Sequence, residues 1–316
     1  MPGYNNIIGR PDVSDAIIPV QVVSEVIKAA TAASVIMTKA KRTPLSTKVA
    51  RQPVLASLPA AYWVDGDTGI KQTDKATWQG LTITAEGLAV IVPIPDAVVD
   101  DANIPLWDEV KPLLAEAAGQ LIDSAALFGK AKPASWPTAI VPGATAAGNV
   151  VQAGTGKDLA VDVASLAGMV ASQGFAINGF ASRPGLSWTL RGLRGANGQP
   201  VLADALNSSG EMSLYGYGLS EVTNGSWDPA VAELIAADWT KVIYGIRQDI
   251  TYDLFSEGVI SDDNGNVVLN LMQQSAKALR MTMRVGFQVG VPATRIGVGT
   301  TYPAGIITPP LPDTEE

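Results

Sequence analysis

The sequence predicts an α+β fold built around an extended β-ribbon, and three observations lead to this prediction. Residues 48–92 contain a strand that runs out to a polar turn and a second strand that returns from it. Residues 105–128 come soon afterwards and carry apolar side chains at helical spacing. Later in the chain, residues 158–173 are helical by period and residues 239–253 and 278–291 suggest strands, so both kinds of element are expected there as well.

The amino-acid composition excludes several classes of enzyme and metal site. The chain has 316 residues, of which 47% are hydrophobic and 16% charged, so it can bury one large core or two modest ones. It contains no histidine and no cysteine. Histidine-based triads, cysteine redox chemistry, disulfides and zinc sites with nitrogen or sulfur ligands are therefore excluded, and only carboxylate, Lys, Tyr or Ser/Lys chemistry stays open.

Charge and hydropathy indicate neither a nucleic-acid site nor a membrane segment. The net charge is −8, and no basic cluster is denser than Lys39, Lys41 and Arg42. Residues 1–50 carry a net +3 and residues 51–130 a net −6, so complementary segments are one expectation and ordinary surface variation is the other. No apolar run approaches the roughly 18 residues of a membrane span, and we expect synthesis in the cytoplasm.

The first 47 residues are predicted to form an arm and a short helix. Proline, glycine and asparagine in residues 1–18 favour turns and extended backbone. Residues 19–41 carry apolar residues at spacings of three and four, which predicts an amphipathic helix with an interruption around Ser34.

The most informative stretch is residues 48–130, in which the ribbon of residues 48–92 returns and leads into the long amphipathic helix. Its return strand alternates at Leu81, Ile83 and Ala85, as expected where one face is covered, and the uniformly apolar residues 88–94 are expected in a core. An isolated two-stranded ribbon is at best marginally stable in water, so we expect another copy of the chain to support it. The residues expected to contact that copy are Tyr62, Trp63, Asp65, Asp67, Lys71, Lys75 and Trp78.

The helix of residues 105–128 is expected to begin with Asp101 or Asn103 as its cap and Pro105 in its first turn. A start at Lys111 is the alternative. Its expected apolar stripe is Leu106, Val110, Leu113, Leu114, Ala117, Leu121, Ile122, Ala125 and Phe128. Pro112 removes one hydrogen bond from the ladder and is expected to bend the helix.

Later segments are predicted in outline. Residues 131–157 are expected to be a loop, residues 158–173 a helix, and residues 239–253 and 278–291 strands. Asn264-Gly265 favours a tight hairpin. The proline-rich tail from Pro303 is expected to pack as an extended strap or to be mobile.

Three short motifs resemble functional sites, but each fits a turn better. Asp67-Thr68-Gly69 matches the aspartic-protease triplet without a second equivalent Asp. Residues 154–157 resemble a phosphate loop, but Asp158 occupies the Ser/Thr position. Residues 262–265 resemble a calcium loop that lacks its first and last ligands. The neighbouring acids Asp100-Asp101 and Asp262-Asp263 are expected in caps and turns, so no catalytic residue, metal or cofactor is predicted.

The order of segments resembles the major capsid proteins of tailed bacteriophages, which share the Hong Kong phage capsid fold. The resemblance runs from the ribbon (AAYWVDGDTGIKQTDKATW) through the return strand (GLAVIVPIPDAVVDD) and the helix end (LFGK) to LRGLRGANGQPVL, AADWTKVIYGIRQDITYDL and ALRMTMRVGFQV. It implies five units: an N-terminal arm with a short helix (1–47), the extended ribbon or E-loop (48–92), a peripheral domain with a spine helix (93–157), a capsomer-centre or axial domain (158–265), and a return to the peripheral domain with a C-terminal strap (266–316).

The resemblance also implies partners. Many copies would form hexamers and pentamers of an icosahedral shell around packaged double-stranded DNA, assembled in the host cytoplasm, with a portal, a possible decoration protein and, because the arm follows Met1 at once, a separate scaffolding protein. Some relatives crosslink a ribbon lysine to a neighbour's asparagine, although solvated charge is the preferred interpretation of Lys71 and Lys75.

Two alternatives stay open. An encapsulin-like nanocompartment shares the fold but encloses a cargo enzyme. A carboxylate-dependent hydrolase using Asp67 is the third possibility and has the least support.

Overall fold

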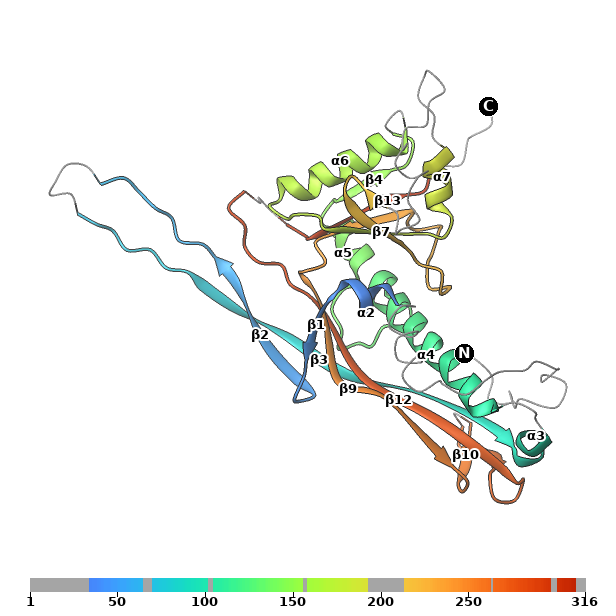
Figure 1. The fold of residues 1–316 in the computed structure, drawn as a ribbon. Helices are drawn as coiled ribbons and strands as arrows, with labels where there is room; N and C mark the ends of the chain where they lie inside the picture. The colour runs from blue at the N-terminus through green and yellow to red at the C-terminus, as the bar shows by residue number, and fades with distance from the viewer. Residues whose placement is uncertain are drawn as a thin grey trace.

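The computed structural model describes residues 34–64, 70–101, 105–155, 158–192, 213–262, 264–296 and 300–310. It contains two β-sheets with helices packed on them and a long two-stranded limb that projects from the body (Figure 1). The α+β prediction is confirmed. The arm expected at residues 1–18 and most of the helix expected at 19–41 lie outside the described residues.

The first sheet has five strands in the order β1-β9-β12-β3-β2. These strands are β1 (Lys41–Pro44), β2 (Val49–Ser57), β3 (Thr77–Pro95), β9 (Val242–Phe255) and β12 (Ala276–Val289). All neighbours are antiparallel except β1 and β9. A separate hairpin of β10 (Val259–Ser261) and β11 (Val267–Asn270) is closed by the expected turn, where the Gly265 N–H donates to the Asp262 carbonyl.

The second sheet has six strands in the order β4-β13-β8-β5-β7-β6. They are β4 (Val150–Gln152), β5 (Gly179–Ser182), β6 (Ser213–Leu214), β7 (Tyr217–Glu221), β8 (Leu234–Ala237) and β13 (Ala304–Thr308). The accompanying helices are α5 (Ile140–Ala146), α6 (Leu159–Ser172) and α7 (Leu186–Gly192). The expected helix at 158–173 is confirmed.

One prediction for these regions is wrong. Residues 131–157 are not only loop, because they include α5 and β4, and Ile140 and Val141 are buried in the main core. The described part of the tail packs in extended form, the first of its two expected arrangements, but it does so as a strand of the sheet: β13 pairs with β4 and β8 and buries Ile306 and Ile307. Burial of these isoleucines stabilises a strand despite the prolines on either side.

β3 belongs to both the limb and the first sheet. Residues 77–84 pair with β2 in the limb, and residues 85–95 pair with β12 in the sheet. Residues 88–94 were expected to be buried throughout, and this is wrong. Leu88, Val90 and Val92 pack beneath the helix, whereas Ile91 is about half exposed on the opposite face. An apolar run does not distinguish a strand covered on two faces from one covered on a single face.

The predicted long helix forms as α4 (Leu106–Asp123) followed by one turn of π-helix, η2 (Ser124–Phe128), and it ends at Gly129 in the left-handed conformation. Pro105 is its N-cap, so the start at Lys111 is wrong, and Asp101 instead closes the short helix α3 (Asp96–Asp101). The stripe is partly wrong, because Leu113, Ala117 and Leu121 are exposed. The helix is continuous through Pro112, and a bend there stays a prediction.

Gly286 permits close packing where β3 passes from limb to sheet. It pairs with Ala85 of β3 and Gly245 of β9, and a Cβ atom at Gly286 would lie 2.9 Å from both the Ile83 side chain and the Thr84 carbonyl oxygen. We expect Gly286→Ala to lower the free energy of unfolding by about 1–3 kcal/mol through overpacking. Urea unfolding of unassembled subunits measures this. The matched control is Gly87→Ala on the same sheet, where a Cβ meets nothing within 4 Å; equal losses in the two variants would contradict the prediction.

Candidate assembly surface

The limb is a paired β-ladder near the body and lacks regular strand pairing farther out. The β2–β3 ladder ends at the pair Ser57 and Thr77. Beyond it, residues 58–64 and 70–76 continue outward without regular strand pairing. They are joined by hydrogen bonds from the Ala60 N–H to Asp74 Oδ2 (2.7 Å) and from Tyr62 Oη to the Gln72 carbonyl (2.6 Å). The outer limb is therefore an extended structure with few contacts of its own.

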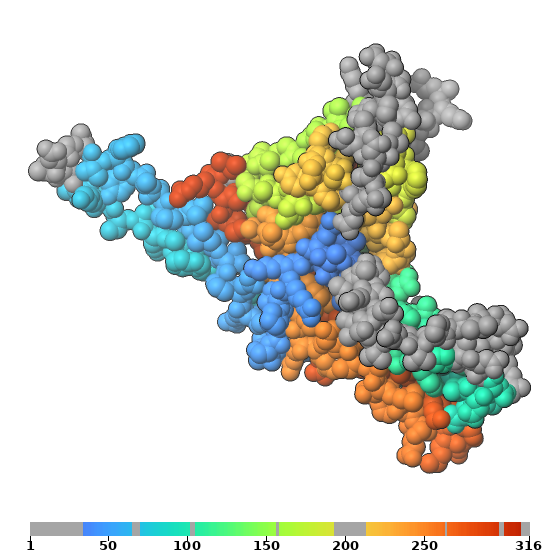
Figure 2. All heavy atoms as spheres, in the orientation of Figure 1, coloured from blue at the N-terminus to red at the C-terminus, as the bar shows by residue number. Residues whose placement is uncertain are grey.

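Within the described residues, the rest of the chain supports the limb at its base and along one strand as far as Pro59. Beneath the base, Leu45, Ile83, Ala85 and Ile243 form a small core. Residues 291–296 run alongside, where the Ala293 N–H donates to the Leu55 carbonyl and Arg295 Nη2 donates to the Pro59 carbonyl. Figure 2 shows the limb leaving the body beyond this support.

Large apolar side chains on the limb face solvent. Trp63 is 100% exposed, Ile70 88% and Trp78 67%, and Tyr62 is also exposed. Rings of this size usually pack into a core or against a partner. The structure thus places Tyr62, Trp63 and Trp78 on one projecting limb, together with exposed Lys71 and Lys75. Asp65 and Asp67 lie outside the described residues, so the Asp67 triplet is not placed.

A buried carboxylate joins the start of the chain to the long helix. Asp123 is fully buried at the last residue of α4. It accepts hydrogen bonds from Ser34 Oγ (2.7 Å), the Val35 N–H (3.0 Å), the Ile36 N–H (3.1 Å) and Asn224 Nδ2 (2.8 Å). Burial raises the pKa of the Asp123 carboxyl, and these donors oppose that rise. We call this group the Asp123 anchor.

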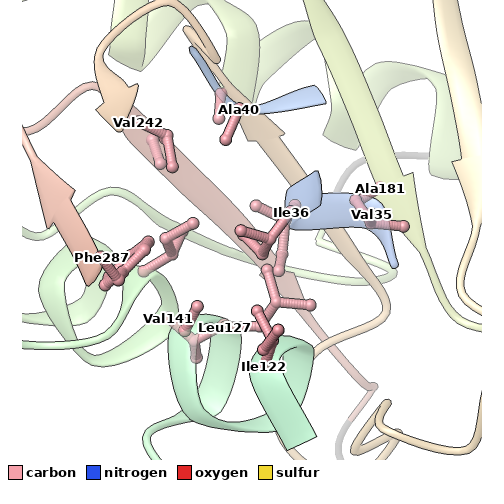
Figure 3. Packing of buried hydrophobic residues seen from close by; sticks show 14 of the residues in the cluster. Val35, Ile36, Ala40, Ile122, Leu127, Val141, Ala181, Val242 and Phe287 are labelled. Carbon is pink, nitrogen blue, oxygen red and sulfur yellow. The ribbon is translucent and has the colours of Figure 1, made fainter. Parts of the chain in front are cut away.

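The Asp123 anchor positions the helix α2 (Val35–Lys39) on the main core. Ser34 is the N-cap of α2, as the interruption expected around this residue suggests, and its Oγ also accepts from the Met37 N–H. Val35 and Ile36 then pack against Ile122 and Leu127 of the long helix (Figure 3). Residues 34–40 are therefore held where they enter the body.

The sequence analysis did not single out Asp123 or Asp74, and it did not predict that Leu113, Ala117 and Leu121 are exposed. The signal for Asp123 is that it is the one charged residue in a mainly apolar helical stretch, residues 121–128. A charge on a buried helix face requires a full set of donors, so its position alone indicates a long-range network. Asp74 gives no comparable signal, because acids are common in exposed turns; its hydrogen bonds from the Ala60 and Lys75 N–H groups lower its pKa.

The turn interpretations of the remaining motifs are confirmed where the structure describes them. Gly154 follows β4 in a turn and donates from its N–H to Asp162, and Asp158 caps α6 by accepting from the Val161 N–H. Asp262 accepts from the Asn266 side-chain amide and from the N–H groups of Asn266 and Asn264, and these hydrogen bonds lower its pKa. Across the described ranges, no group of three or more acids is arranged to hold a metal ion.

No helix in the described part of the chain is long and apolar enough to cross a membrane.

Comparisons with known proteins find relatives of this chain. A family model described as the phage capsid family matches residues 15–294. The major capsid protein of Staphylococcus phage 80alpha is 27% identical over 259 residues, covering 81% of this chain and 76% of that protein.

Solved structures agree. One from Microbacterium phage Oxtober96 is 36% identical with a TM-score of 0.80, covering 96% of this chain and all of its own. One from Mycobacterium phage Cain is 30% identical with a TM-score of 0.79, covering 97% and 100%. The capsid of a native GTA particle shares the fold at a TM-score of 0.65 and 15% identity, with 95% of each chain covered. The chain belongs to the phage capsid family.

Proposed function

We propose that this chain is the major capsid protein of a tailed double-stranded DNA bacteriophage, and that copies of it assemble into hexamers and pentamers of an icosahedral shell. Membership of the phage capsid family supports the shell role. The observation that supports self-assembly is the exposure of large aromatic side chains on the limb, where Trp63 is 100% exposed and Trp78 is 67% exposed in the described part of the chain. Burial of such side chains between copies is a strong drive for association.

The proposed contact residues are Tyr62, Trp63, Asp65, Asp67, Lys71, Lys75 and Trp78. The exposure of the described members supports this assignment. A portal, a scaffolding protein, a possible decoration protein and enclosed DNA are proposed as partners, with the mature virion capsid as the location and the host cytoplasm as the place of assembly.

The role is structural rather than enzymatic in this proposal. The relatives named above come from phages and a GTA particle, and they do not favour the encapsulin alternative. Neither do they supply a reason to revive the hydrolase hypothesis based on Asp67.

Negative-stain microscopy and sedimentation of the purified protein test the proposal. We expect closed shells, or hexamers and pentamers that close into shells when scaffolding protein is added. Well-folded monomers under both conditions would contradict it. DNA recovered inside particles from infected cells separates a phage shell from a cargo compartment.

Pro112 is proposed as the point at which the spine helix bends when the shell matures. Pro112 lacks the N–H that would donate to the Asp108 carbonyl, so the first two turns of α4 are more loosely joined to the rest. We expect Pro112→Ala to stiffen the helix and slow expansion of immature shells, followed by light scattering and microscopy. Expansion at the normal rate would remove Pro112 from this role.

A further inference from the structure

Three lysine side chains gather where the two sheets join. Lys39 is the last residue of α2, Lys41 begins β1, and Lys241 lies in the connection from β8 to β9. β8 belongs to the second sheet and β9 to the first. The three side chains line a hollow of about 490 Å³, whose other walls are Asn178, Trp239 and Thr240. We call this hollow the lysine pocket.

The lining of the lysine pocket contains no acidic residue within the described part of the chain. A carboxylate beside it belongs to Asp238, whose Oδ2 lies 4.0 Å from Lys241 Nζ. Lys39 Nζ donates to the Gly218 carbonyl, which is an uncharged group. Lys41 is exposed and forms no ion pair with a residue in the described ranges. The pocket is therefore electropositive and suits an anionic ligand.

A second hollow, of about 220 Å³, continues from the lysine pocket and shares Lys41, Thr240 and Lys241 with it. It extends to β2 at the base of the limb, where Gln52 lines it. The Gln52 Oε1 atom is buried and has no hydrogen-bond partner among the described residues. A buried acceptor without a partner costs free energy, so a ligand that brings an N–H group to it is favoured.

These features favour an acidic peptide segment over a nucleic acid as the ligand. A peptide backbone supplies N–H donors for Gln52, whereas the phosphate groups of a nucleic acid only accept hydrogen bonds. The net charge of −8 opposes the approach of a long polyanion such as duplex DNA. A short acidic segment that belongs to a neighbouring molecule is held close by the other contacts of an assembly, which raises its effective concentration.

The densest acidic segment of the chain has this character. Asp313, Glu315 and Glu316 place three carboxylates within four residues, and no other four-residue window of the sequence contains as many. They lie outside the described residues, and the strand that precedes them is β13. β13 begins at Ala304, which pairs with the end of β8 beside the lysine pocket, and runs to Thr308 in the direction away from the pocket. A second copy is therefore the expected source of the segment.

We propose that residues 313–316 of a second copy bind in the lysine pocket, with their carboxylates paired to Lys39, Lys41 and Lys241. This inference rests on the proposed function, because assembly brings the two copies together, and it adds a contact that does not involve the limb tip. An extended segment of four residues spans ~13 Å, which allows its carboxylates to meet lysines from three separate elements. Opposite charges at such a contact fix its register.

Acetylation of lysines measures whether the lysine pocket is occupied. Particles of the full chain and of an amide variant are treated with an amine-reactive acetyl ester, and each lysine is quantified by mass spectrometry. The amide variant carries Asp313→Asn, Glu315→Gln and Glu316→Gln. We expect Lys41 and Lys241 to react roughly tenfold faster in the variant, which corresponds to a contact weaker by about 1.4 kcal/mol. Lys277 at the start of β12 pairs with Asp96 and is the internal reference, expected to react equally in both particles.

A crosslink identifies the chain that supplies the segment, and the absence of cysteine from the sequence makes the crosslink specific. We pair Thr314→Cys with Thr240→Cys, which keeps all three acids and all three lysines, and treat assembled particles with a short bis-maleimide. Denaturing gels are expected to show a ladder of covalent oligomers, at least roughly tenfold stronger than with the control pair Thr314→Cys and Met272→Cys. Met272 is 69% exposed and lies in the turn after β11.

The outcomes separate the inference from the proposed function. Particles that form normally but crosslink no better than the control pair overturn the inference and leave the capsid role intact, and this result also decides the matter if the amide variant does not assemble. Crosslinks confined to single chains, or protection of Lys41 and Lys241 only in DNA-filled particles, assign the pocket to another occupant and overturn the inference as well. Failure of the unmodified chain to form particles under any condition overturns the capsid role itself.

Discussion

Deleting residues 57–77 and joining the remaining strands by a tight turn is expected to abolish shell formation while leaving the subunit folded. The small core beneath the limb base and the pairing of residues 85–95 with β12 do not involve the deleted residues. The deletion removes Trp63, and an indole ring buries ~200 Å² in a good contact. At ~25 cal/mol per Å², that burial stabilises the contact by about 5 kcal/mol. That corresponds to a contact weaker by roughly three to four powers of ten.

Circular dichroism and size-exclusion chromatography report folding of the deletion variant, and negative-stain microscopy reports shells. The matched control is Gln72→Ala with Thr73→Ala, which alters exposed side chains of the same segment outside the proposed contact set and leaves its apolar surface in place. We expect this control to assemble. Normal particles from the deletion variant would show that the limb is dispensable.

Substituting Asp123 is expected to give the largest loss of stability of any single change discussed above. Asp123→Ala leaves four buried donors without their acceptor, and the remaining Ser34, Val35, Ile36 and Asn224 groups cannot all find new ones. The expected loss is about 3–5 kcal/mol in the free energy of unfolding, because each buried unsatisfied donor costs ~1–3 kcal/mol and neighbouring losses are not additive.

Asp123→Asn is the more discriminating variant because it keeps the shape. Its amide oxygen still accepts from Ser34 Oγ and the Ile36 N–H, but its NH₂ group meets the Val35 N–H and Asn224 Nδ2, which are also donors. We expect about 2 kcal/mol of destabilisation by urea unfolding of unassembled subunits.

The matched control for both variants is Asp108→Asn on the same helix. Asp108 forms a partly exposed ion pair with Lys111 at 2.7 Å, and such pairs contribute less than ~1 kcal/mol. Equal losses at positions 108 and 123 would show that the Asp123 anchor is not a stabilising network.

The ribbon and the long helix could be predicted because their signals are local. Alternation at Leu81, Ile83 and Ala85 and the cap at Gly129 depend on near neighbours in the chain. Which flank of a helix or face of a strand is covered depends on distant segments. Leu113 and Leu121 fit a helical stripe as well as Leu114 does, yet only Leu114 of the three is buried. Likewise, β13 depends on pairing with β4 and β8, which its own residues do not specify.

The limb and the sheet share β3 without an intervening loop. β3 is paired along its whole length, and its hydrogen-bonded ladders resist shear. A force on one end of the strand is therefore passed along the backbone, because side-chain motion absorbs little of it. β3 therefore acts as a lever with its fulcrum near Gly286, where the backbones lie too close for a methyl group. In an assembled shell, we expect a push on the outer end of β3 to reach the residues of the same strand that lie under the spine helix, because the strand is paired along its whole length.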